Sequence, residues 1–191
     1  MRDVLDAITR LELVYEDVSP HLSNTDADFT CRAILHYKTL LADGGFDQSR
    51  LDVSWSEFND RYGSMSIDGF TAEVLAVGIW NKHNKHTTFA FGDGQKNTEV
   101  SGCDVVVNNP NWNRSYVVQV KNVTSLNSTI IAKSNWLKYS TFAVNRLVLV
   151  HTAQRKLLCM DYLKFLQYQH DNEFMHVDAL VKLKNSRMLS L

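Results

Sequence analysis

Polar side chains interrupt two apolar runs in the segment SGCDVVVNNPNWNRSYVVQVKN, residues 101–122. Asp104 heads the first run, and Gln119 and Lys121 fall inside the second. Burying a carboxylate, an amide or an ammonium group away from water is costly unless the group finds a partner. Two kinds of partnership suit these residue types: a structural ion pair between neighbouring strands, or a site where oxygen ligands hold a hard cation and a lysine acts on water.

A hairpin would bring the three polar side chains together. The NNPNWNR sequence between the runs is rich in turn residues and allows the runs to pair antiparallel. Because side chains alternate across a strand, Gln119 and Lys121 share one face of the second run. Asp104 then lies near the edge formed by these two residues, so the sequence predicts a carboxylate, an amide and an ammonium group in one place.

A helix expected from about residue 66 to His83 supplies a second carboxylate. Its apolar residues recur at steps of three or four positions and define a core-facing stripe of Ile67, Phe70, Val74 and Val77. Glu73 borders this stripe, so its side chain can point toward the sheet. We therefore expect Glu73 to join the three polar residues of the hairpin.

The remaining periodicity predicts an α/β domain. Further helices are expected at 2–16, from Thr25 or Asp26 to about 41, at 54–58, over 130–144 and at 161–170. Strands are expected at 87–91, 103–107, 116–120 and 146–152. The order from residue 66 onward is helix, three strands, helix, strand, which fits an antiparallel meander followed by a right-handed crossover.

With these elements in place, the spacing of the polar residues is similar to that of a known family. Asp104, fourteen intervening residues and then Gln119-Val120-Lys121, preceded by a helix with Glu73, resembles the PD-(D/E)xK (restriction endonuclease-like) nuclease superfamily. The resemblance covers roughly residues 66–152. Cys103 stands where the family name has proline. Gln119 stands where an acidic residue is usual, and some members of the family also have glutamine there.

The resemblance implies both an architecture and an activity. The expected fold is a restriction-endonuclease-like core over 66–191, with a helical addition over 1–65 that serves dimerisation or target recognition. The implied activity is that of a metal-dependent DNA endonuclease of the restriction type, which hydrolyses phosphodiester bonds. Cutting both strands of a duplex calls for two sites, so a homodimer or a partner nuclease subunit is expected.

The family pattern also gives each polar residue a role. Glu73, Asp104 and Gln119 are the expected ligands of Mg²⁺, with Mn²⁺ as a substitute, and Lys121 is expected to orient or deprotonate water or to stabilise the phosphate. Two alternatives stay open. One is a Holliday-junction resolvase or transposon-type nuclease, and the other is a catalytically inactive nuclease-fold module that binds nucleic acid or protein.

Charge is distributed unevenly along the chain. Residues 1–70 hold 13 acidic and 6 basic residues, whereas 71–191 hold 8 acidic and 14 basic residues. A basic part suits a polyanionic partner such as DNA, although acidic and basic surfaces could simply pack beside each other. In KSNWLKYS, residues 133–140, Lys133 and Lys138 are candidates for contact with the nucleic-acid backbone. The basic cluster HNKH at 83–86 is explained more simply by the dipole at a helix C-terminus.

Cysteine usage and hydropathy indicate a cytoplasmic protein. Cys31, Cys103 and Cys159 are widely spaced and odd in number, which argues against a disulfide framework and favours a reducing compartment. The first residues alternate charged and apolar side chains, unlike a signal peptide, and no apolar run reaches the length of a membrane span. We therefore expect no membrane partner.

Overall fold

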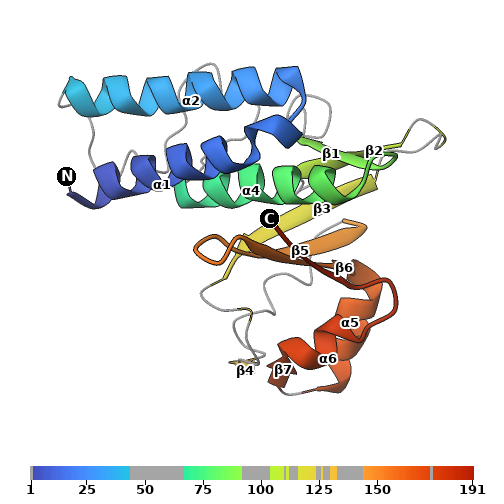
Figure 1. Cartoon of the computed structure of the whole chain (residues 1–191). Helices are drawn as coiled ribbons and strands as arrows, with labels where there is room; N and C mark the ends of the chain where they lie inside the picture. Colours follow the sequence, from blue (N-terminus) through green and yellow to red (C-terminus); the bar gives the residue numbers. More distant parts are fainter. Residues whose placement is uncertain are drawn as a thin grey trace.

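Helices cover both faces of a central sheet. The computed structural model describes residues 2–43, 67–91, 104–109, 111, 116–123, 126, 130–132, 144–172 and 174–191. On one face lie α1 (Arg2–Val18), the short 3-10 helix η1 (Ser19–His21), α2 (Asn24–Ala42) and α4 (Ile67–His83). On the other lie α5 (Tyr162–Asp171) and α6 (Val177–Val181), beside a small sheet of β4 (Ile130–Ala132) and β7 (Phe174–His176) (Figure 1).

The central sheet has six strands in the order β1-β2-β3-β5-β6-β8. Its strands are β1 (Thr88–Phe91), β2 (Val105–Asn108), β3 (Tyr116–Asn122), β5 (Arg146–His151), β6 (Lys156–Asp161) and β8 (Arg187–Ser190). Strands β1, β2 and β3 form an antiparallel meander, and β5 then pairs parallel to β3. The last two strands, β6 and β8, continue antiparallel. The sheet is therefore mixed, and the fold is α/β as the sequence predicts.

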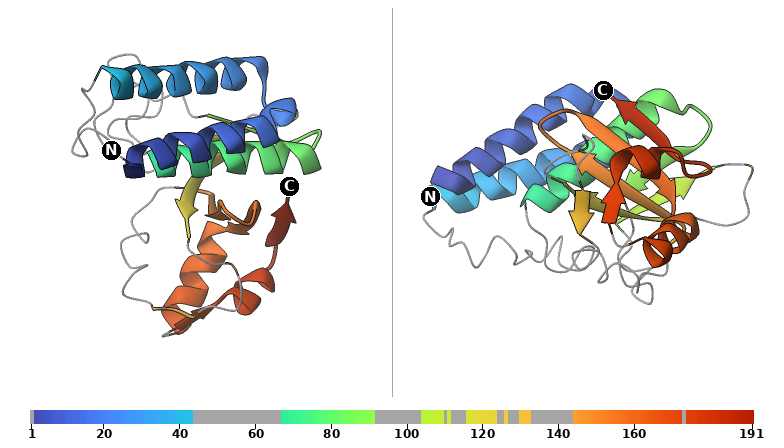
Figure 2. Two further views of the ribbon diagram at one scale, coloured as in Figure 1. Left: turned by 60° about the vertical axis from the view of Figure 1, so that its left-hand side comes forward. Right: turned by 90° about the horizontal axis from the view of Figure 1, so that it is seen from below.

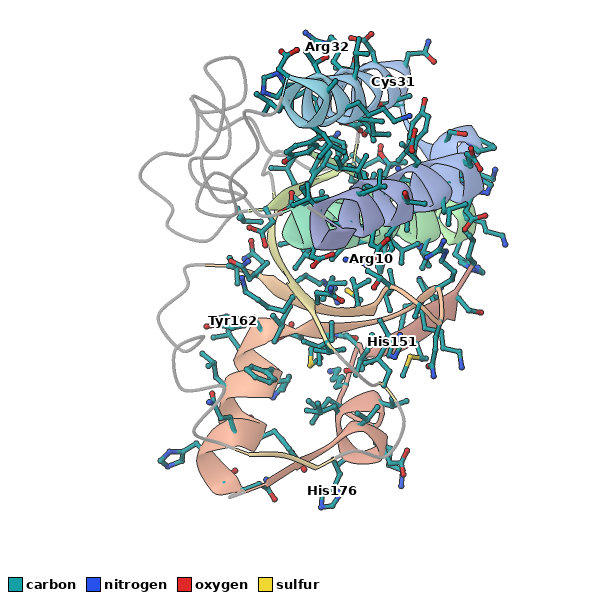
Figure 3. The ribbon with its side chains drawn as sticks, turned by 90° about the vertical axis from the view of Figure 1, so that its left-hand side faces the viewer. Arg10, Cys31, Arg32, His151, Tyr162 and His176 are labelled. Carbon is teal, nitrogen blue, oxygen red and sulfur yellow. The ribbon has the colours of Figure 1, made fainter. Side chains whose placement is uncertain are left out.

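Each face of the sheet packs on its own apolar core. In β3, Val118 and Val120 belong to the core shared with α1, α2 and α4, while Val117 packs against the core under α5 and α6. This division follows from the alternation of side chains along a strand. The left view of Figure 2 shows the same separation of helices from another direction, and Figure 3 shows Tyr162 at the start of α5, next to the sheet.

Helix α4 is the central helix of the upper layer, because it packs on both α1 and the sheet. Twelve of its seventeen residues are buried, so the core-facing stripe expected from the sequence is too narrow. A Cβ atom at Gly78 would overlap the Val18 side chain, which explains why this position brings α4 so close to the end of α1. A helix enclosed in this way can hold a carboxylate such as Glu73 out of water.

Most expected elements occur within two residues of their predicted bounds, and two differences are informative. Helix α2 begins at Asn24, slightly earlier than expected, because Ser23 is its N-cap and accepts a hydrogen bond from the Asp26 backbone N–H at 3.1 Å. The helix expected over 130–144 is wrong at its start, where residues 130–132 form strand β4. The expected helix at 54–58 and the rest of 130–144, apart from Val144, lie outside the described residues.

None of the described helices combines the length and the apolar character that crossing a membrane requires.

Candidate active site

Strand pairing places Asp104 directly beside Gln119. Val105 pairs with Val118 in the antiparallel register, so Asp104, one residue before β2, lies opposite Gln119. The Asp104 backbone N–H donates to the Val118 carbonyl at 3.0 Å, which continues the ladder by one residue. The Asp104 Oδ2 atom accepts hydrogen bonds from the Val120 backbone N–H at 2.7 Å and from the Gln119 amide nitrogen. The carboxylate is thus fixed against β3.

The amide of Gln119 is held in one orientation. Its Nε2 atom donates both to Asp104 Oδ2 and to the Val120 carbonyl, the latter at 3.2 Å. Two acceptors on the same side favour the nitrogen there, so the oxygen, Oε1, points the other way. Gln119 is only 1% exposed, and its Oε1 atom has no hydrogen-bond donor among the described residues.

Glu73 approaches from helix α4 and is also buried. Its side chain is 7% exposed, and its Oε2 atom has no donor in the described part of the chain. Burial, and then the negative charge of Asp104, raises the pKa of Glu73 well above its ordinary value, while the positive charge of Lys121 opposes this shift. The charges of Asp104 and Lys121 therefore both act on the Glu73 carboxyl.

Asp104 has a raised pKa as well. Burial raises the pKa of its carboxyl from 3.8 to about 6, against the opposing effects of Lys121, the Val120 N–H and the Gln119 amide. The two carboxyl groups interact with each other, have little contact with solvent and share one lysine. When both are ionised, the single positive charge of that lysine does not balance their two negative charges. A pair of this kind is typical of sites that bind a cation or transfer a proton.

The cluster combines residues from both faces of the sheet. Val118 and Val120 pack in the core that includes α4, so alternation places Gln119 and Lys121 on the opposite face of β3. Glu73 comes from α4, yet its charge interacts with both Asp104 and Lys121. Asp104, which directly precedes β2, interacts with each of the other three side chains: it is hydrogen-bonded to Gln119 and acts electrostatically with Glu73 and Lys121.

The oxygen atoms left over suit a hard cation. Within the described residues, Gln119 Oε1 and Glu73 Oε2 are buried and receive no hydrogen bond, and the hydrogen bonds from Val120 and Gln119 both go to Oδ2 of Asp104. Carboxylate and amide oxygens are the ligands that Mg²⁺ takes in proteins. Among the described residues, no three His, Cys, Asp or Glu side chains are grouped as a metal ion would require, and the present cluster has two carboxyl groups and one amide.

Two contributors to the cluster were not expected from the sequence. The first is the backbone N–H of Val120, which binds Asp104 and depends on strand register, not on residue type. The second is Tyr37 of α2, which is 2% exposed and whose pKa is raised by burial and then by the charge of Glu73. A tyrosine within an amphipathic helix gives no signal of this kind, so only the packing of α2 reveals it.

The proposed DNA-contacting lysines, Lys133 and Lys138, lie outside the described residues.

Comparison with known proteins yields no match: no protein-family model, no curated protein and no solved structure matches this chain.

Proposed function

We propose that this chain is a metal-dependent DNA endonuclease of the PD-(D/E)xK type, with Glu73, Asp104, Gln119 and Lys121 as its active site. One observation carries the proposal: beside a meander of three strands, the buried Glu73 carboxyl and the partly buried Asp104 carboxyl interact with each other and with Lys121, and Asp104 is hydrogen-bonded to the Gln119 amide. A purely structural polar cluster would be expected to satisfy its buried oxygens, and here Glu73 Oε2 and Gln119 Oε1 have no donor within the described chain.

The order of elements supports the same proposal. Helix α4 precedes the antiparallel strands β1, β2 and β3, and β5 returns parallel to β3. This is the order of helix, meander and parallel strand that the resemblance implies, with the polar residues at the expected positions on the helix, on the second strand and on the third. The restriction-endonuclease-like core is accordingly part of the proposal.

The donor set fits a divalent cation such as Mg²⁺ or Mn²⁺. Glu73, Asp104 and Gln119 would hold it through side-chain oxygens, two of which, Glu73 Oε2 and Gln119 Oε1, are buried without a donor in the described residues. When bound, the ion supplies compensation for the carboxylate charges, polarisation of the phosphate and a lowered pKa of water. A neutral amide in place of a third carboxylate leaves the site with more net positive charge and weaker affinity for the ion.

The chain's own residues would then position the substrate. The Lys121 ammonium group attracts the phosphodiester and stabilises the charge that grows on its oxygens during attack by water. Hydrolysis forms one P–O bond to the water oxygen and breaks the P–O bond to the leaving sugar oxygen, which takes up a proton. The Val120 N–H keeps the Asp104 carboxylate oriented throughout, because its hydrogen bond is set by the strand ladder.

One observation favours the alternative of an inactive module. The Gln119 amide nitrogen, instead of its oxygen, faces Asp104, and this is the arrangement expected of a structural hydrogen bond. An inactive protein of this fold would bind nucleic acid or protein without cutting. Metal binding separates the two functions, since an active site requires a cation and a structural hydrogen bond does not.

The test is incubation of the purified protein with supercoiled, linear, single-stranded and branched DNA, with and without Mg²⁺ or Mn²⁺. We expect metal-dependent cleavage of at least one form, and no cleavage by Asp104→Ala purified in the same way. Cleavage restricted to branched DNA favours the resolvase function. No cleavage of any form, together with no Mn²⁺ binding, leaves the inactive module, and equal cleavage by the variant assigns the activity to a contaminant.

A further inference from the structure

A second polar feature lies at the other end of helix α4. A pocket of about 330 Å³ opens between η1, the end of α4 and the first two strands. Its volume is within the range of small-molecule sites. It is lined by Pro20, His21, Leu22, Ser23, Asn81, Asn84, Lys85, Thr88, Phe89, Ala90 and Asn108.

Two amide side chains form fixed walls of the pocket. Asn81 accepts from the Phe89 backbone N–H at 2.7 Å and donates to the Phe89 carbonyl at 3.0 Å. Asn84 donates to the Trp80 carbonyl at 2.8 Å and accepts from Arg187 at 2.7 Å. Since these bonds occupy both ends of each amide, the walls are preorganised and their polar atoms are already used.

Three further polar side chains of the pocket are open donors, whereas the Ser23 hydroxyl is already bonded to Asp26. Within the described residues, His21, Lys85 and Asn108 have no hydrogen-bond or ion-pair partner. Among the described lining residues there is no aspartate or glutamate. Burial lowers the pKa of His21. The charges of Lys82, Lys85 and His83 lower it further, so the surroundings of the pocket are positively charged. A preorganised pocket with open donors and no acid is suited to an anion.

We propose that this pocket binds a phosphate group, held by Lys85, His21 and Asn108. The ammonium, the imidazole and the amide supply charge-assisted and neutral N–H donors to the phosphate oxygens. The phosphate belongs either to a free ion or mononucleotide, or to the backbone of DNA. Asp104 directly precedes β2 and Asn108 is its last residue, roughly 13 Å away along the strand, so this site is separate from the candidate active site. It does not depend on the proposed nuclease function.

The test is a titration monitored by the NMR signals of the His21 ring. The probes are inorganic phosphate, a deoxynucleoside 5′-monophosphate and a short DNA duplex, all in EDTA so that no metal occupies the other site. The proteins are the wild type, Lys85→Ala and the matched control Lys164→Ala, which removes the same charge from an exposed position on α5. Asn108→Ala provides a second variant in the pocket.

We expect saturable shifts of His21 in the wild type and in Lys164→Ala, with affinity lowered about tenfold or more in Lys85→Ala. Shifts with phosphate or the mononucleotide identify a small ligand, and shifts with the duplex alone identify the DNA backbone. Either result supports the site. No shift with any probe, or equal weakening by Lys85→Ala and Lys164→Ala, overturns the proposal.

Discussion

Two groups of polar side chains, one inside the N-terminal half of helix α4 and one at its C-terminal end, have different surroundings in the fold. Near its C-terminus, Asn81 and Asn84 use both ends of their amides in hydrogen bonds to the backbone or to Arg187. Nearer its N-terminus, Glu73 is buried with an oxygen that has no donor in the described residues and with a raised pKa.

This contrast separates structure from function. The asparagines stabilise the fold. Asn81 pairs with the N–H and carbonyl of Phe89 on the outer edge of β1, and its removal would leave these backbone groups unpaired. Glu73 offers no such benefit, since a buried carboxyl without a donor costs roughly 1–3 kcal/mol. Residues that reduce stability in this way are found most often at functional sites.

The largest expected effect lies in the cluster around Asp104. Asp104→Ala and Lys121→Ala should each reduce metal-dependent DNA cleavage by about 10³-fold or more, because each removes a charge that acts on the reacting phosphate or its cation. The fold should persist, since neighbouring valines supply the packing of β2 and β3. Cleavage rates and circular dichroism measure the two effects, and a variant that cuts at the wild-type rate would show that its residue has no catalytic role.

The opposite outcome is expected at Asn81. Asn81→Ala leaves the Phe89 N–H and carbonyl without their partners and should lower the free energy of unfolding by roughly 2–3 kcal/mol. Cleavage by the folded fraction should be unchanged. Urea denaturation measures the loss, with Lys82→Ala, an exposed neighbour, as a control expected to change stability by less than about 0.5 kcal/mol. A loss of activity larger than the loss of folded protein would remove the contrast between the two ends of α4.

A smaller effect of opposite sign is expected for Glu73→Gln. The folded pKa of Glu73 is raised, so between the unfolded and folded pKa values the folded state binds more protons than the unfolded state. Without metal, wild-type stability should therefore fall as pH rises through this window, which for Asp104 extends to about 6. Removing the Glu73 ionisation should leave the variant more stable than the wild type by roughly 1–2 kcal/mol above the window.

Thermal denaturation across pH in EDTA checks this prediction. Glu16→Gln, which changes the same residue type at an exposed position of α1, is the matched control and should show no pH-dependent difference from the wild type. The same Glu73→Gln protein should bind Mn²⁺ more weakly and cleave more slowly. If the stability difference between Glu73→Gln and the wild type does not grow with pH, the pKa of Glu73 is not raised in the folded state.

How far the sequence predicts this fold depends on whether each element has a local signal. The meander, α4 and β5 follow from hydrophobic periodicity, and the placement of Asp104 beside Gln119 follows from the hairpin. Strand β6 was not expected, because it follows β5 through a turn whose left-handed residue is Arg155, at φ 50°, where glycine or asparagine would have given the signal. Strand β4 was expected as helix, although Ile130 and Ile131 are β-branched and favour strands.

The candidate site was predictable to the extent that it rests on strand register. Asp104, Gln119 and Lys121 are related by pairing and alternation, which a sequence reveals. The direction of the Gln119 amide cannot be predicted from the sequence, because it depends on which neighbouring groups are acceptors after folding. The proximity of Tyr37 to Glu73 likewise depends on how α2 packs across α4, and helix packing leaves no mark in local sequence.

The smallest expected effect tests the most unusual residue of the cluster. Gln119→Glu adds a third carboxyl group to the site, and metal affinity in oxygen-ligand sites rises with ligand charge. We expect Mn²⁺ to bind about tenfold more tightly, by roughly 1.4 kcal/mol. The gain depends on the metal, because without it the new carboxylate faces Asp104 in place of an N–H donor, and the metal-free variant should be less stable than the wild type.

Calorimetric titration with Mn²⁺ measures this change against the matched control Gln167→Glu, which adds the same charge at an exposed position on α5. The control should bind Mn²⁺ as the wild type does. If Gln119→Glu binds no more tightly than the control, Gln119 does not coordinate the ion and its hydrogen bond to Asp104 is structural. In that case Glu73 and Asp104 alone supply the protein ligands, and the buried Oε1 atom of Gln119 must be satisfied by water instead of metal.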